Sequence, residues 1–382
     1  MFNVKAALAA GTFAASTALA LPAATTSATP TSTNPCYVTQ YTAIPAATAS
    51  CTAITLSNIH VPGNETLNLS KLKTGTTVTF AGTTTFGYAD ANYNMITAGG
   101  TNITITAEVG AIIDGNGQAW WDGQGSNGGM TKPDHFFTVS KALGNSVIKD
   151  LHIRNYPTHC FSISNCVGLV LENIVLDNSA GNAPNNRSGG LPAAHNSDGF
   201  DLSSCNNTII QNSVVSNQDD CVAITSGNNI TVSGLVCTGS HGLSIGSVGG
   251  KSNNNVTNIT FKDSTVLNSQ NGARIKSNSG TTGHIANVTY ENIVLGNIST
   301  YGIDIQQDYL NGGPTGIPTN GVTITGVRMS NVIGTAQSTA KNYYILCGQG
   351  SCSDFTFENV HVVGGKGSSC NFEPSGNFVC AP

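Results

Sequence analysis

A repeat of short apolar strands constrains the fold of this chain more than any other feature of its sequence. Seven segments share one form, in which a short strand, a polar corner and a second short strand end near Asn or Gly. They read SVIKDLHIRN, GLVLENIVLDN, NTIIQNSVVSN, NITVSGLVCTG, NITFKDSTVLN, NVTYENIVLGN and GVTITGVRMSN. The five middle segments align on one valine each: Val175, Val214, Val236, Val266 and Val294. The first interval between successive valines is long, and the next three are shorter.

The strands of this repeat are half-buried and have no helix between them. Val, Ile and Leu alternate with polar residues in short runs, and no part of the repeats keeps a helical period. Units of strand, helix and strand would need helices here, and a β-sandwich usually has longer single strands. The composition agrees, because 44 glycines and only 9% charged residues fit poorly with a helical protein. We therefore predict an all-β, single-domain fold, a right-handed parallel β-helix.

The N-terminal residues are predicted to direct secretion. Lys5 precedes an uncharged, alanine-rich stretch with a small-residue cleavage pattern at 18–20, so residues 1–20 are expected to be a signal peptide rather than a membrane anchor. Residues 21–35 are a Ser/Thr/Pro-rich pro-segment or flexible leader, and residues 36–382 form the β-helix domain. We expect a secreted, extracellular monomer. The net charge of −5 argues against nucleic acid or a membrane as a partner.

Secretion makes disulfide bonds the expected state of the eleven cysteines, and an odd number leaves at least one thiol unpaired. Short separations suggest four pairs: Cys36 with Cys51, Cys221 with Cys237, Cys347 with Cys352 and Cys370 with Cys380. Cys160, Cys166 and Cys205 stay unassigned. Since no compact Cys/His cluster has zinc spacing, no metal and no other cofactor is expected. Most of the N-x-Ser/Thr sequons are expected to be strand-boundary asparagines rather than glycan acceptors.

Polar residues recur at nearly the same interval as the strands. The interval from Asp198 to Asp219 equals the interval from Asp220 to His241. Both are close to the interval from Val214 to Val236, which is one repeat of the strands. Residues one coil apart in a β-helix lie one above another, so three successive coils are expected to present these side chains on one face. The stretch NGARIKS follows in the next coil and places a cationic pair, Arg274 and Lys276, on one face of a strand.

Each of these residues has a structural alternative, because Asp at a corner often forms a turn and a cationic pair can be a solvated edge. The adjacent Asp219 and Asp220 are harder to explain in this way. On a regular strand one of them would point into the core, where an unpaired carboxylate is costly. We therefore expect a local distortion of the backbone at this pair. The register that links all four coils favours one functional site over four separate structural features.

Several carboxylates, a histidine and two cations on an exposed groove suit glycoside hydrolysis with inversion. One protonated carboxyl protonates the leaving oxygen while another carboxylate activates a water molecule on the opposite face of the sugar. Clustered acids raise one another's pKa, which keeps one of them protonated, and His241 can tune that proton. The Arg274 and Lys276 pair suits the carboxylate of a uronic acid, so the site fits a polyuronide.

These motifs resemble the polygalacturonases of glycoside hydrolase family 28, most closely the secreted endo-acting fungal type. The matching stretches, in family order, are WWDGQGSNGG, HNSDGFD, NQDDCVAI, GSHGLSIGSVGG, ARIKS and YGIDIQQDY. The resemblance extends from about position 36 to about position 380. It implies a β-helix of about ten coils and a catalytic domain that hydrolyses α-1,4-linked galacturonic acid in polygalacturonate and pectin with inversion.

The resemblance also implies residue roles. Asp219 is expected to be the general acid, supported by His241, while Asp198 and Asp220 activate water. The expected substrate-binding residues are Arg274, Lys276, Tyr309 and Asn196. The resemblance supports the four disulfide pairs and makes Asn258 the expected glycosylation site. Two features depart from the family pattern: Ser197 stands where Thr is usual, and the long loop 178–196 is expected to wall the cleft ahead of Asp198.

Other functions stay open at this point. An exo-acting polygalacturonase is the nearest alternative, and a rhamnogalacturonan hydrolase is disfavoured by His241, Arg274 and Lys276. A pectate lyase would need calcium, for which no loop pattern is evident. From a different class, a non-catalytic β-helix that binds polysaccharide would predict no activity to lose when Asp219 is replaced.

Overall fold

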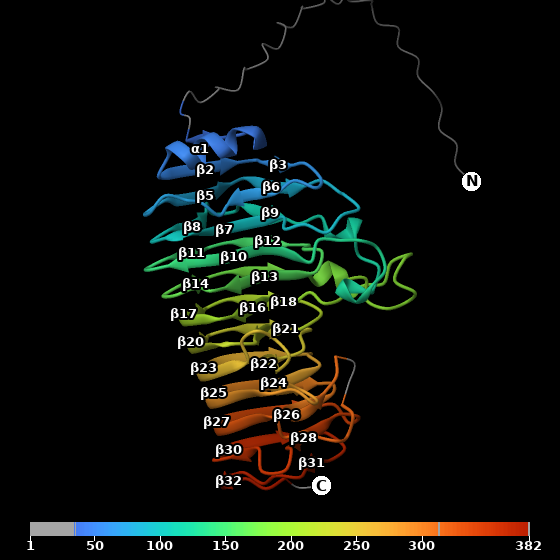
Figure 1. Ribbon diagram of the computed structural model, residues 1–382. Helices are drawn as coiled ribbons and strands as arrows, with labels where there is room; N and C mark the ends of the chain where they lie inside the picture. Colours follow the sequence, from blue (N-terminus) through green and yellow to red (C-terminus); the bar gives the residue numbers. More distant parts are fainter. Residues whose placement is uncertain (1–33, 35, 312–313, 381–382) are drawn as a thin grey trace, which may run out of the picture. The chain divides into compact units, whose positions relative to one another are not determined.

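The computed structural model describes residues 34, 36–311 and 314–380, and the strands in this part of the chain form a parallel β-helix (Figure 1). The signal peptide expected at 1–20 and nearly all of the leader expected at 21–35 lie outside the described residues. All pairings between named strands are parallel, and each strand pairs with its equivalent in the next coil. The predicted all-β fold, a right-handed parallel β-helix, is confirmed.

One face of the helix is a sheet of eleven strands, which carries the candidate site. In order they are β4 (Leu67–Leu69), β7 (Ile96–Thr101), β10 (His135–Leu143), β13 (His159–Ser164), β16 (Phe200–Ser203), β19 (Val222–Ile224), β22 (Leu243–Val248), β24 (Asn271–Asn278), β26 (Tyr301–Tyr309), β28 (Lys341–Leu346) and β31 (Ser369–Cys370).

The remaining strands form the other faces. One series consists of β1 (Tyr37–Val38), β2 (Ala53–Ser57), β5 (Thr77–Ala81), β8 (Thr104–Ala107), β11 (Val147–Lys149), β14 (Val170–Glu172), β17 (Cys205–Gln211), β20 (Gly227–Ser233), β23 (Asn255–Leu267), β25 (Gly283–Ile298), β27 (Val322–Ala336), β29 (Cys352–Ser353), β30 (Thr356–Val363) and β32 (Ser375–Gly376). The other consists of β3 (His60–Val61), β6 (Thr83–Phe86), β9 (Ile112–Asp114), β12 (His152–Arg154), β15 (Val175–Asp177), β18 (Val214–Ser216) and β21 (Val236–Thr238), and it joins the first series at β23.

Helical structure among the described residues is confined to short segments. They are α1 (Ile44–Ser50) and four 3₁₀ turns, η1 (Tyr41–Ala43), η2 (Gly117–Ala119), η3 (Gly125–Asn127) and η4 (Ser179–Asn182). The helix α1, which was not predicted from the sequence, lies beside the first strands of the β-helix (Figure 1). It buries Ile44 and Ala47, so it covers apolar surface that the first coil would otherwise expose. No helix of the described residues is long and apolar enough to cross a membrane.

The core is built from side chains stacked in register from coil to coil. Phe137, Phe161 and Phe200 are opposite one another on successive strands, and their rings stack at centroid distances of 4.9 and 5.3 Å. All three rings are buried. This register fixes how the coils before the candidate site lie on one another.

One of the predicted alignments is wrong by a single position. Val236 pairs with Thr265, and Val266 pairs with Cys237. Val266 is buried, whereas Val236 on the preceding coil is 39% exposed. Neighbouring residues of a strand point to opposite faces of the sheet. Aligning Val266 instead of Thr265 with Val236 therefore places a core residue opposite a surface residue.

Many coil corners are asparagines in the left-handed backbone region, as expected of strand-boundary residues. Asn258 has a φ of 57° and belongs to a ladder of side-chain amides. Its Nδ2 donates to Asn228 Oδ1 at 2.7 Å, and Asn287 Nδ2 donates to its Oδ1 at 3.1 Å. Asn258 is exposed, and its glycosylation stays a prediction.

The cysteines pair as the short separations suggested: Cys36–Cys51, Cys221–Cys237, Cys347–Cys352 and Cys370–Cys380. Cys160, Cys166 and Cys205 are free, and all three are buried.

Candidate active site

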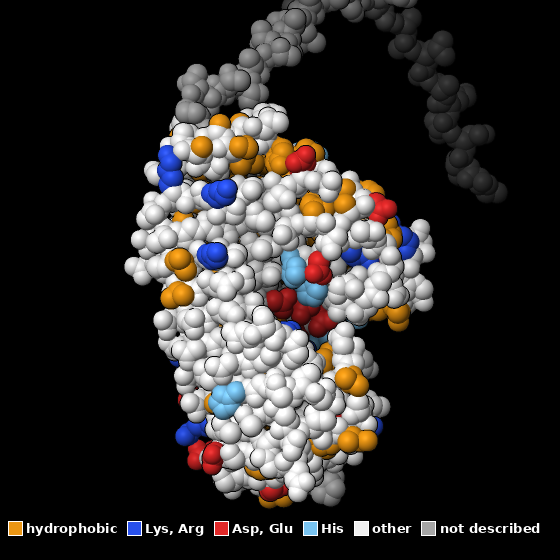
Figure 2. Space-filling view, in the orientation of Figure 1, with side chains coloured by type: hydrophobic (Ala, Val, Ile, Leu, Met, Phe, Trp, Pro, Cys, Tyr) orange, Lys and Arg blue, Asp and Glu red, His pale blue; other side chains and the backbone are white. Residues whose placement is uncertain are grey.

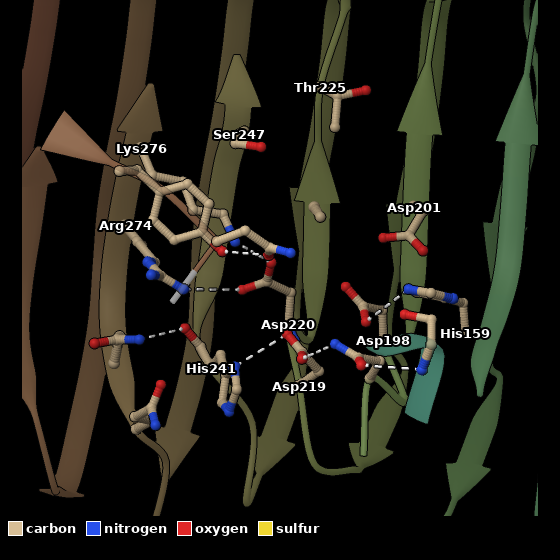
Figure 3. A pocket seen from close by; sticks show the side chains of 18 of the residues that line it. His159, Asp198, Asp201, Asp219, Asp220, Thr225, His241, Ser247, Arg274 and Lys276 are labelled. Carbon is tan, nitrogen blue, oxygen red and sulfur yellow. Dashed lines mark hydrogen bonds and ion pairs between the residues drawn. The ribbon is translucent and has the colours of Figure 1, made fainter. Parts of the chain in front are cut away.

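The two adjacent aspartates lie in a bend rather than on a regular strand, as expected. Asp219 and Asp220 precede β19, and the side chain of Asn217 holds the bend. Its Nδ2 donates to the carbonyl oxygens of Ser197 (2.8 Å), Asp219 (3.0 Å) and Asp220 (2.9 Å). The bend allows both carboxylates to reach the same groove (Figure 3).

The register across the site differs in one respect from the predicted one. Phe200 is opposite Val222, and the amide of Gly199 donates to the carbonyl of Asp220. Asp198 is therefore level with Asp220 and not with Asp219, because this coil is one position longer than the interval between Asp198 and Asp219. The predicted interval from Asp220 to His241 does fit the register, since Val222 is opposite Leu243.

The predicted residues converge on a groove of about 910 Å³. Figure 2 shows a hollow on the visible face in which acidic side chains and histidines gather. The predicted site residues that line it are Asn196, Asp198, Asp219, Asp220, His241, Arg274, Lys276 and Tyr309. The structure therefore brings all eight candidate catalytic and substrate-binding residues together.

Asp219 is held between a histidine and an amide. Its Oδ1 lies 3.0 Å from His241 Nδ1 and accepts from the amide of Asp220, while its Oδ2 accepts from Asn196 Nδ2 at 3.2 Å. Burial raises the pKa of Asp219, but the charge and hydrogen bond of His241 and the charge of Lys276 outweigh it. The pKa of the Asp219 carboxyl therefore lies below its usual range.

Asp220 is bound to two cations from β24. Lys276 Nζ lies 2.7 Å from its Oδ2 and Arg274 Nη1 lies 3.7 Å from its Oδ1, which also accepts from Ser244 Oγ at 2.7 Å. Both cations also lie over the ring of Tyr309, at 5.5 Å for Arg274 and 5.1 Å for Lys276. The aromatic ring and the carboxylate fix the positions of the cations.

Asp304 stabilises Arg274 from behind. Arg274 Nε donates to Asp304 Oδ2 at 3.0 Å, and Asp304 is fully buried. Burial raises the pKa of Asp304 to about 7, against the lowering effect of Arg274. This pair leaves the outer part of the guanidinium directed at Asp220 and the groove.

Asp198 has few favourable contacts. Its Oδ1 is buried without a hydrogen bond, and the nearest basic side chain is His159, whose Nε2 lies 3.6 Å away. Burial and the charges of Asp219 and Asp201 raise the pKa of Asp198 well above its usual value, and the charge of His159 opposes this shift. Asp201, which follows on β16, has its pKa raised to about 6, first by burial.

Four residues of the site were not predicted from the sequence: His159, Asp201, Ser244 and Asp304. A signal for His159 was available, because it precedes Asp198 by the same interval as that between Val175 and Val214. Asp304 likewise follows Arg274 by one full coil and is opposite it in the sheet. Neither residue falls in the short intervals on which the prediction was based.

The long loop 178–196 forms part of the wall, as expected. Asn185 Nδ2 and Arg187 Nε donate to the carbonyl of Trp121 at 3.0 and 3.1 Å, so the loop is tied to the segment that contains η2. Its last residues, His195 and Asn196, line the groove. The adjacent Ser197 uses its hydroxyl to bind Gln218 Oε1 at 2.7 Å, a contact that either Ser or Thr could make.

Three groups of side chains in the described residues have ligand atoms close enough for a cation: Asp134, His135 and His159; His159, Asp198 and Asp201; and Asp198, Asp219 and Asp220. The last two groups share Asp198, and the carboxylates of Asp219 and Asp220 already contact His241, Lys276 and Arg274. The arrangement is therefore a set of carboxylates compensated by protein cations, which suits acid–base chemistry.

An open groove on a parallel β-helix, lined by clustered carboxylates and cations, defines a glycoside hydrolase of the β-helix type. The chain matches the glycosyl hydrolases family 28 over residues 51–379. It is 57% identical over 338 residues to a probable endopolygalacturonase D of Neosartorya fischeri, covering 88% of this chain and 71% of that protein. It is also 57% identical over 342 residues to a polygalacturonase of Fusarium fujikuroi, covering 89% and 92%. This chain belongs to glycosyl hydrolase family 28.

Solved structures agree with this assignment. Endopolygalacturonase I from Stereum purpureum, complexed with two galacturonates, superposes with a TM-score of 0.77 at 33% identity, covering 88% of this chain and 96% of that one. An endo-xylogalacturonan hydrolase from Aspergillus tubingensis has the same fold, with a TM-score of 0.66 at 24% identity over 88% and 96% of the two chains.

Proposed function

We propose that this protein is an endo-acting hydrolase of α-1,4-D-galacturonosidic linkages in polygalacturonate and pectin, which inverts the anomeric configuration. The observation that carries the proposal is the convergence of Asp198, Asp219 and Asp220 beside Arg274 and Lys276 in one groove. Relatives that are 57% identical are named as polygalacturonases, which supports the substrate class.

The catalytic step divides acid and base between the aspartates. Asp219 protonates the glycosidic oxygen as the bond to the anomeric carbon breaks, and His241, 3.0 Å away, supplies the proton that Asp219 donates. Asp198 and Asp220 hold a water molecule on the opposite face and accept its proton as its oxygen bonds to the anomeric carbon. The products are two shorter chains, and the new reducing end has the inverted configuration.

The cations recognise the substrate's acidic groups. Arg274 and Lys276 are buried and held by Asp220, Asp304 and Tyr309, so they are already positioned before substrate binds. A galacturonate carboxylate beside them gains two cationic partners at little further cost in side-chain ordering. A neutral sugar at the same place would lose this interaction, so the site discriminates in favour of uronic acids.

Cleavage within the chain is supported by the extent of the groove on both sides of the aspartates. Its lining includes Ser126 and His135 from preceding coils and Thr300 and Asn311 from following ones. Sugar units can therefore occupy both directions from the scissile bond. An exo-acting enzyme needs a barrier at one end, and loop 178–196 is the segment that could supply one.

Product analysis tests the proposal. Polygalacturonate viscosity should fall well before the release of reducing ends becomes extensive, and NMR of the first products should give the inverted anomer. A strictly proportional fall in viscosity and rise in reducing ends would favour exo action. If the wild-type protein and Asp219→Asn were equally without activity while both bound the polymer, the non-catalytic alternative would be supported instead.

The protein is proposed to act outside the cell as a monomer. Four disulfide bonds among eleven cysteines fit an oxidising compartment. Size-exclusion chromatography with light scattering should give the mass of one chain, and the protein should be recovered from the culture medium.

A further inference from the structure

His159 connects an aspartate outside the predicted site to one inside it. On one side, its Nδ1 lies 3.2 Å from Asp134 Oδ1 and 2.9 Å from the carbonyl oxygen of Asp134. On the other side, its Nε2 lies 3.6 Å from Asp198 Oδ1, and Figure 3 shows the imidazole directed at that carboxylate. The side chain is 19% exposed, so water screens these interactions only weakly.

The neighbours of His159 come from the coils on both sides. Asp134 and His135 belong to the preceding coil, and the His135 ring stacks on it at a centroid distance of 5.2 Å. Asp198 and Asp201 belong to the following coil, and Cys160 is the adjacent residue on β13. Burial disfavours the charged form of the imidazole, but the three carboxylates around it favour that form and outweigh the effect of burial.

His159 completes a pattern of charge pairing in the site. Asp219 has His241 as its cation, and Asp220 has Lys276 and Arg274. Asp198 has no Lys or Arg within ion-pair distance among the described residues, and His159 is the basic side chain that faces it. A buried carboxylate that must accept a proton needs such a partner, because burial alone would keep it protonated.

We propose that His159, oriented by Asp134, is a positioning residue that favours the ionised form of Asp198 against the effect of burial and directs its carboxylate at the attacking water. The Asp134 carboxylate fixes the ring and holds Nδ1–H, so the imidazolium presents Nε2–H to Asp198. This inference rests on the proposed hydrolytic function, because it concerns the carboxylate that activates water. It assigns a role to two residues that are not among the eight predicted site residues.

The direct test is an NMR titration of the His159 imidazole in the intact wild-type protein, with the resonance assigned by its loss in His159→Gln. The expected pKa is above the ordinary value of about 6.5 for histidine. A value below it would overturn the proposal, whether or not any variant folds. This measurement does not depend on activity, so it separates failure of the inference from failure of the proposed function.

The kinetic test is the pH profile of kcat on polygalacturonate. His159→Gln removes the charge but keeps a donor of similar size, so the Asp198 pKa should rise and the acidic limb of kcat should move upward by about one pH unit, a roughly tenfold loss at a fixed pH on that limb. KM should change less than kcat. A fall in kcat that is uniform over pH, with no movement of the acidic limb, would mean that His159 has only a structural role.

Two further variants sharpen the result. Asp134→Asn should shift the acidic limb in the same direction by a smaller amount, and it should add nothing to His159→Gln in the double variant, because Asp134 acts through His159. Fully additive effects would contradict this. His284→Gln is the matched control: His284 is an exposed histidine on β25 that contacts Thr323 at 2.7 Å, and its replacement should leave the profile unchanged.

Discussion

Lys276 Nζ lies 2.7 Å from Asp220 Oδ2, and both side chains are buried in the floor of the groove. The pair joins the two halves of the proposed site, because Asp220 belongs to the acid cluster and Lys276 to the cationic subsite. Removing one member breaks a buried ion pair, which typically costs about 3–5 kcal/mol because the remaining charge loses its nearest partner.

Lys276→Met should therefore lower both stability and activity. KM for polygalacturonate should rise at least tenfold because a substrate carboxylate loses its cation, and the unfolding midpoint should fall. Adding Asp220→Asn should restore much of the stability but none of the activity, since it removes the carboxylate that lost its lysine, which is also a proposed catalytic group. Lys366→Met, at an exposed lysine, is the control and should leave both unchanged. A Lys276→Met variant with normal KM would remove Lys276 from the substrate site.

Asp219→Asn should reduce kcat on polygalacturonate by about 10²- to 10⁴-fold while the fold is retained, because the leaving oxygen loses its proton donor. The loss should be much smaller on an aryl galacturonide whose leaving group is a stable phenolate, since such a leaving group needs no proton. Asp198→Asn should be equally damaging on both substrates. If the aryl substrate rescued Asp198→Asn and not Asp219→Asn, the acid and base assignments would have to be exchanged.

The β-helix and most of its site could be predicted because equal spacing in a solenoid becomes adjacency in space. Asp219, Asp220 and His241 lie within one short coil, so their relationship was visible in the sequence. The register of the strands could not be predicted to the residue. The structure differs from the predicted alignment by a single position at Asp219 and again at Val266. The alternation of apolar and polar residues does not show where such a shift of one position occurs. His159 was missed because loop 178–196 lengthens its coil and hides its adjacency to Asp198.

The buried aspartates should determine how the stability of the fold depends on pH. Burial raises the pKa of Asp201 to about 6 and that of Asp304 to about 7, so between about pH 4 and 7 the folded state binds more protons than the unfolded chain. Stability therefore falls as pH rises through this window. Asp219 has the opposite effect on stability. Its pKa is lowered in the folded state, so the stability that it contributes is lost as the pH falls below about 4.

The thermal midpoint should accordingly be highest near pH 4 to 5. Asp201→Asn should flatten the decline between pH 4 and 7, because it removes one of the groups whose pKa is raised. Differential scanning calorimetry over pH 3 to 8 provides the measurement. A midpoint that rises steadily from pH 4 to 8 would contradict the raised pKa values of Asp201 and Asp304.

The Cys221–Cys237 disulfide is expected to matter for catalysis as well as stability, because Cys221 directly follows Asp220. It closes a separation of 16 residues and ties the bend that contains Asp219 and Asp220 to β21. Replacing both cysteines with alanine should cost about 3 kcal/mol of unfolding free energy, and it should lower kcat more than it raises KM, since the carboxylates lose part of their support.

The matched control is the alanine double variant of Cys370 and Cys380, a pair with a separation of 10 at the C-terminal end of the β-helix. That variant should lose stability but keep its kcat at a temperature where it stays folded. Equal kcat in the two double variants would mean that the Cys221–Cys237 bridge stabilises the fold without positioning the aspartates.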